Sequence, residues 1–164
     1  MSQSAPPPPY EQQPQPSDAV PYAPPVPPAP QKDNVALGLV AALGAALVAA
    51  ALYGVVIGLT KHEIGWAAVG VGFVIGLAAG KVGGRNPALA VAGAMLALGA
   101  VYIGHLVGEA MIGADSVGVS FSKLIFQHFG LVQDAWKEDA DPLTFLFFGL
   151  AAFAAFSGTK KAAA

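Results

Sequence analysis

The stretch IGWAAVGVGFVIGLAAGKVGGR, residues 64–85, decides the fold class of this chain. Its residues 64–80 carry no charge, and Lys81 and Arg85 follow in a short glycine-rich turn. A helix of about 20 apolar residues, with a usual range of about 17 to 25, spans the hydrocarbon core of a bilayer. The pattern therefore predicts a membrane-spanning helix that ends at a basic turn. Three further stretches are also uncharged and apolar: 35–59, 86–108 and 142–159.

The composition of the whole chain agrees with a membrane protein. Of its 164 residues, 55% are hydrophobic and 11% are charged, and the mean hydropathy is +0.59. A soluble domain carries about 25% charged residues. The chain has no cysteine, which excludes disulfides, thiolate metal sites and thiol catalysis. A net charge of -2 without a basic stripe gives nucleic-acid binding no support, so the lipid bilayer is the expected partner.

The predicted fold is an all-α membrane protein with four transmembrane helices in a small bundle, occupying residues 35–159. A cap residue stands before each of three expected helix starts: Asn34, Asn86 before Pro87, and Asp141 before Pro142. The expected spans are about 35–59, 64–81, 87–110 and 142–159.

Residues 1–34 form a segment of a different kind, because they contain 12 of the 14 prolines. Proline fixes φ and lacks a backbone donor, so we predict a disordered tail that samples polyproline II and coil. Two roles stay open for this tail. It is either a flexible segment, or its PPPPY motif docks in an aromatic-lined groove.

The connection 111–141 is too long for a plain turn and too polar to span a membrane. Within it, SFSKLIFQHFGLVQDAW places apolar residues at helical spacing. We therefore predict a short amphipathic helix in the membrane interface, with Trp136 at headgroup level. A lid over the end of the bundle is the alternative.

Orientation is predicted from the lysines and arginines in short loops, which favour the cytoplasmic side. With the tail inside, that side receives Lys32, Lys81, Arg85, Lys160 and Lys161, and the opposite side receives Lys61, Lys123 and Lys137. We expect a multi-pass protein of the cell membrane with both termini cytoplasmic, residues 160–164 being a short basic end.

Glycines recur at four-residue spacing in three of the expected helices. Small residues let helix backbones approach closely in lipid, where the hydrophobic effect cannot hold helices together. The sequence therefore predicts helix packing at these glycines, either inside the bundle or between subunits. The set is Gly54, Gly58, Gly72, Gly76, Gly80, Gly104 and Gly108.

Two polar islands interrupt the apolar runs and contain the candidate site residues His62, Glu63, His105 and Glu109. Under the expected topology all four lie toward the extracytoplasmic end. Imidazole and carboxylate are ligands for zinc, iron or copper, and ionisable residues in membrane helices are functional candidates. A metal or haem site and a proton- or ion-handling site are thus two hypotheses, although no HExxH or haem-attachment motif is present. The third hypothesis is anchoring and packing, with Glu63 capping or orienting the second helix and no cofactor bound.

The segment HEIGWAAVGVGFVIGLAAGKVGGR, residues 62–85, resembles a hairpin of short, uncharacterised bacterial integral membrane proteins. The proline- and tyrosine-rich tail looks like that of actinobacterial membrane proteins. The resemblance covers roughly residues 54–108 and implies four helices without an established activity, so it carries over no catalytic residue. The matching positions are Glu63, Gly65, Trp66, Gly70, Gly72, Phe73 and Gly76.

No catalytic constellation is found in the sequence, so the leading hypothesis is a non-enzymatic scaffold or accessory subunit. It would act through helix–helix association, as a homo-oligomer or in a larger membrane complex. The alternative is a transporter, channel or metal- or haem-binding component that uses the extracytoplasmic His/Glu cluster.

Overall fold

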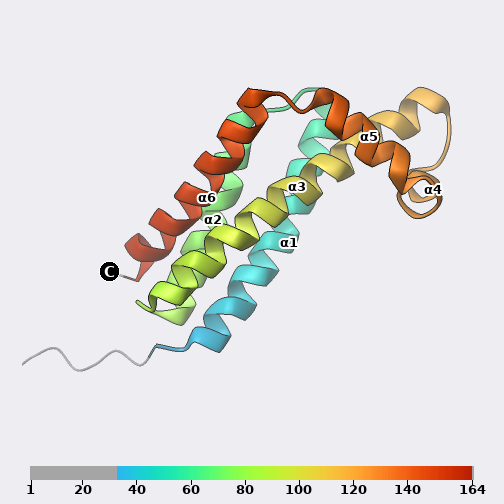
Figure 1. The fold of residues 1–164 in the computed structure, drawn as a ribbon. Helices are drawn as coiled ribbons and strands as arrows, with labels where there is room; N and C mark the ends of the chain where they lie inside the picture. Colours follow the sequence, from blue (N-terminus) through green and yellow to red (C-terminus); the bar gives the residue numbers. More distant parts are fainter. Residues whose placement is uncertain (1–32, 164) are drawn as a thin grey trace, which may run out of the picture. The chain divides into compact units, whose positions relative to one another are not determined.

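The computed structural model describes residues 33–163, and the predicted tail with its PPPPY motif lies outside this part except for its last two residues. The described residues are helical and contain no strand, which confirms the all-α prediction (Figure 1). The helices are α1 (Val35–Thr60), α2 (Gly65–Gly83), α3 (Pro87–Val117), α4 (Phe121–Gln127), α5 (Phe129–Asp139) and α6 (Pro142–Ala162).

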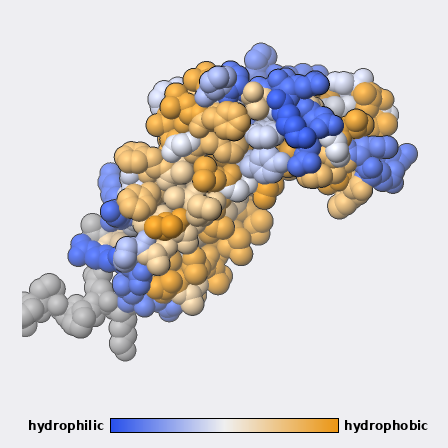
Figure 2. Space-filling view, in the orientation of Figure 1, coloured by the Kyte–Doolittle hydropathy of each residue, from blue (hydrophilic) through white to orange (hydrophobic). Residues whose placement is uncertain are grey.

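Four of these helices, α1, α2, α3 and α6, are long and apolar enough to cross a membrane. Large apolar side chains cover their outer faces; Leu47 on α1, for example, is 61% exposed. In Figure 2 hydrophobic residues cover the middle of the visible face of the bundle, and hydrophilic residues gather toward its ends. The chain is therefore an all-α, multi-pass membrane protein.

The predicted cap residues begin three of the long helices. The side chain of Asn34 accepts a hydrogen bond from the Leu37 amide at 3.1 Å, and Asn86 accepts from the Ala88 amide at 2.9 Å. Asp141 accepts from the Thr144 amide at 2.7 Å, and the Thr144 hydroxyl completes a capping box. These bonds satisfy amides that a helix start leaves without a partner.

α3 is longer than the sequence predicts, because it continues past residue 110 to Val117. Its 31 residues correspond to about 46 Å, against about 30 Å for the hydrocarbon core. The extension has a small core of its own, in which Leu106 and Ala110 of α3 pack with Leu124 of α4 and Val132 of α5. This packing explains why the chain stays helical where its sequence turns polar.

The amphipathic segment is confirmed as helical, but it forms two helices in place of the single helix expected. α4 ends and α5 begins at His128, whose φ of -127° and ψ of 33° are not helical. Both helices pack against α3 and against each other.

The seven predicted packing glycines lie between helices of the same chain. A Cβ on Gly72, Gly76 or Gly80 of α2 would overlap the backbone of α6. A Cβ on Gly54 would lie 2.6 Å from Val107, and one on Gly104 would lie 2.7 Å from the Tyr53 ring. Gly58 and Gly108 likewise meet Met111 and Ile57. Two seams result, α2 against α6 and α1 against α3, and both are internal.

The two ends of the bundle differ in charge. We call the end with the α1–α2 turn and the start of α6 the acidic end, and the end with the α2–α3 turn the basic end. At the basic end, the Arg85 amide donates to Asp33 at 2.9 Å and the Arg85 Nε donates to the Ala163 carbonyl at 2.8 Å. The basic end thus ties the starts of α1 and α3 to the end of α6.

Candidate functional site

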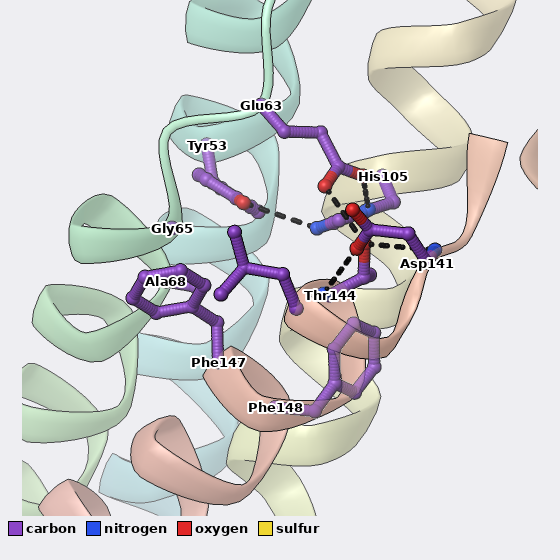
Figure 3. A pocket seen from close by; sticks show the side chains of 10 residues that line it. Tyr53, Glu63, Gly65, Ala68, His105, Asp141, Thr144, Phe147 and Phe148 are labelled. Carbon is purple, nitrogen blue, oxygen red and sulfur yellow. Dashed lines mark hydrogen bonds and ion pairs between the residues drawn. The ribbon is translucent and has the colours of Figure 1, made fainter.

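Two of the predicted site residues, Glu63 and His105, meet at the acidic end although they come from different helices of the sequence. His105 Nδ1 lies 2.5 Å from Glu63 Oε1 (Figure 3). The His105 side chain is 3% exposed, whereas that of Glu63 is 32% exposed. The pair therefore joins a buried ring to a carboxylate that reaches the surface.

The packing of α1 on α3 brings a third group to this pair. Gly104 leaves space for the Tyr53 ring, and the Tyr53 hydroxyl lies 3.0 Å from His105 Nε2. With its proton on Nδ1, a neutral His105 donates to Glu63 and accepts from Tyr53, so both ring nitrogens are satisfied. A charged ring would turn Nε2 into a donor and leave the buried Tyr53 proton in need of another acceptor.

The turn after α1 directs Glu63 into the bundle. Lys61 adopts the left-handed conformation, with φ 56°, and its amide donates to the Ile57 carbonyl at 2.7 Å. The helix stops there, and Ile64, which has no side-chain capping bond, precedes α2. The predicted capping of α2 by Glu63 is therefore wrong, because the carboxylate bonds His105 and Thr144 instead.

The Thr144 hydroxyl lies between two carboxylates. It is 3.2 Å from Glu63 Oε2 and 2.9 Å from Asp141 Oδ1. A hydroxyl has one proton and donates to one of them at a time. The hydrogen bonds from the Thr144 amide and hydroxyl also lower the pKa of Asp141, so this cap residue stays ionised at neutral pH.

These side chains border a cavity of about 200 Å³ that opens to the surface (Figure 3). The polar groups of its wall belong to Tyr53, Glu63, His105, Asp141 and Thr144. The apolar part is made by Gly65, Ala68, Leu143, Phe147 and Phe148. The wall thus holds two carboxylates and neither a lysine nor an arginine. Lys61, beside the cavity in sequence, pairs with Asp115 at 2.8 Å.

The other two predicted site residues have different surroundings. His62 is exposed, and its Nδ1 lies 2.7 Å from the Thr60 carbonyl of the same turn. Glu109, one helical turn after His105, is partly buried and interacts electrostatically with Glu63, Asp139 and His105. Between residues 33 and 163, no group of three or more histidine and acidic side chains is placed to hold a metal ion.

Sequence reasoning missed Asp141, Thr144, Phe147 and Phe148, which all come from the first turns of α6. The segment before α6 was expected to be only a solvated acidic turn. The Asp-Pro cap that begins α6 predicted the helix start, but no local signal indicated that this start lies beside Glu63.

No family model, curated protein sequence or solved structure matches this chain. The resemblance to bacterial membrane proteins stays an expectation carried by residues 54–108. Its fold places the chain among the small, all-α, multi-pass membrane proteins.

Proposed function

We propose that this protein is a non-enzymatic membrane protein that binds a small cation in the pocket at its acidic end. The observation that carries this proposal is the charge of the pocket wall. Glu63 and Asp141 both border the cavity, and the bonds of His105 are complete in its neutral form. A bound cation would neutralise the charge that the wall leaves unbalanced.

A purely structural role explains this network less well. Burying an ion costs several kcal/mol, and apolar side chains of similar volume often stabilise a fold equally well. An ionisable pair of this kind in a membrane helix bundle therefore favours a functional role. Here the pair also borders an open cavity, which apolar packing would have filled.

The pocket would face the outside of the cell. Of the described lysines and arginines, Lys81, Arg85, Lys160 and Lys161 lie at the basic end, and Lys61, Lys123 and Lys137 lie at the acidic end. This distribution favours a cytoplasmic basic end. The seven acidic residues from Glu63 onward are all at the other end, where they would attract cations from outside.

Calorimetric titration of the full chain in a non-ionic detergent tests the proposal. The probes are sodium, potassium and ammonium chloride, each against the wild type and against Glu63→Gln and Asp141→Asn. We expect saturable binding of at least one cation, weakened in both variants and unchanged in Asp134→Asn. Asp134 is a matched control because it is exposed and pairs with Lys137 on α5. Equal binding by all four proteins would refute the pocket as the site.

A second candidate function, an accessory subunit that associates through its helices, is favoured by a groove between α1 and α2. This groove of about 310 Å³ is apolar, and its floor includes Ala49, Ala67 and Gly70. A Cβ on Gly70 would meet nothing within 4 Å, so this glycine is not used inside the bundle. A helix of a second copy could approach closely there.

Native mass spectrometry of Gly70→Leu tests this second candidate. We expect the variant to lose a dimer that the wild type forms, because leucine would fill the groove. Gly149→Leu is the control, since Gly149 of α6 also has open space around its Cβ position but lies outside the groove. A monomeric wild type, or a dimer that survives Gly70→Leu, would exclude association at this groove.

A further inference from the structure

We infer that the ligand of the acidic-end pocket is a small organic ammonium ion, held between the carboxylates of Glu63 and Asp141 and the rings of Phe147 and Phe148. This inference rests on the proposed function and names the class of cation.

The first argument is the aromatic half of the pocket wall. A desolvated cation is attracted to the face of an aromatic ring, and organic ammonium ions also bury their carbon atoms against such rings. Phe147 and Phe148 border the cavity from α6. An inorganic cation would need oxygen ligands around it and would gain little from this hydrocarbon surface.

Both rings are held in place by neighbouring aromatic groups. The Phe147 ring packs edge-on against Trp66, with centroids 5.6 Å apart, and Phe148 packs edge-on against His105 at 5.4 Å. Gly65 makes room for Phe147, because a Cβ at that position would overlap the ring. The aromatic wall is therefore preformed in the absence of a ligand.

The second argument is the number of hydrogen-bond donors at the carboxylates. The single Thr144 hydroxyl proton serves both Glu63 and Asp141. An ammonium group that donates to one carboxylate would release the hydroxyl to donate to the other. The pocket is thus one donor short, and a protonated amine supplies donors together with positive charge.

The third argument is size. A cavity of about 200 Å³ has the volume of roughly six or seven liquid water molecules at about 30 Å³ each. It exceeds the space that a bare alkali ion needs and suits an amine with a short carbon chain.

The test uses n-propylammonium chloride as the probe and propan-1-ol as its uncharged comparator, titrated calorimetrically into the full chain in detergent. Trp66 fluorescence is a second readout because this ring packs on Phe147. We expect saturable binding of propylammonium and none of propanol. Glu63→Gln and Asp141→Asn should each weaken binding roughly 10- to 100-fold, the effect of losing a hydrogen bond to a charged group.

Phe147→Leu separates the organic cation from an inorganic one. This variant should weaken propylammonium binding and leave any binding of sodium or ammonium unchanged. Asp141→Asn keeps an oxygen that caps α6, so it decides the outcome if Glu63→Gln does not fold. Binding of sodium or ammonium without propylammonium would overturn the inference and leave the proposed function standing. Absence of binding by every cation would overturn both.

Discussion

Gly76→Ala should destabilise the bundle strongly for a substitution of one methyl group. A Cβ at Gly76 would lie 2.8 Å from the Ala155 Cα and closer still to the Ala155 carbonyl oxygen. Ordinary Cβ contacts begin at 3.4 Å, so α2 and α6 would have to separate by at least 0.6 Å. A gap of 0.5–1 Å removes about a quarter to a half of a van der Waals contact, and overpacking typically costs about 1–3 kcal/mol. We expect a loss near the upper value, with a Tm lower by roughly 5–10 °C in detergent.

Gly70→Ala is the matched control for this prediction. It lies in the same helix, but its Cβ would contact nothing. Replacing a glycine inside a helix by alanine favours the helix by up to about 1 kcal/mol, so this variant should be neutral or more stable. Thermal unfolding followed by circular dichroism compares the two. If Gly76→Ala unfolds at the same temperature as Gly70→Ala, the α2–α6 seam does not hold the backbones as closely as the structure shows.

Three further predictions concern the acidic end and the topology. The lowered pKa of Asp141 means that its contribution to stability is complete above its ordinary value of 3.8 and is lost as the pH falls through the lowered pKa; Asp141→Asn should flatten this acid limb of Tm between pH 3 and 5. Tyr53→Phe should cost about 1–2 kcal/mol by removing the donor to His105, whereas Tyr102→Phe, at a part-buried bond, should cost less in the same unfolding assay. In intact cells an impermeant thiol reagent should label Ser116→Cys and not Lys161→Cys; the reverse pattern would invert the proposed orientation.

The helices could be predicted from the sequence because their signals are local. Uncharged runs of sufficient length indicate spans, and the side chains of Asn34, Asn86 and Asp141 form the capping bonds expected of them. The end of α3 could not be predicted, because contacts with α4 and α5 extend it through a stretch that looks like a loop.

The site was predictable only in part for the same reason. Glu63 and His105 stood out as ionisable groups at the ends of apolar runs, but their partners depend on which helices pack together. The expected helix cap at Glu63 assumed that only α2 lay within its reach. Thr144, which comes 81 positions later, takes that carboxylate instead.

The glycine seam and the pocket are two consequences of one helix register. Gly72 meets Ala151, Gly76 meets Ala155 and Gly80 meets Thr159, so each pair differs by the same 79 positions. Continued toward the acidic end, this register places Thr144 beside Gly65 and Phe147 beside Ala68, and all four residues line the pocket. Because α2 and α6 both start at that end, their close approach also fixes the distance between Glu63 and Thr144. A substitution that separates the seam should therefore disturb the pocket as well, and Gly76→Ala should weaken cation binding although it lies outside the cavity wall.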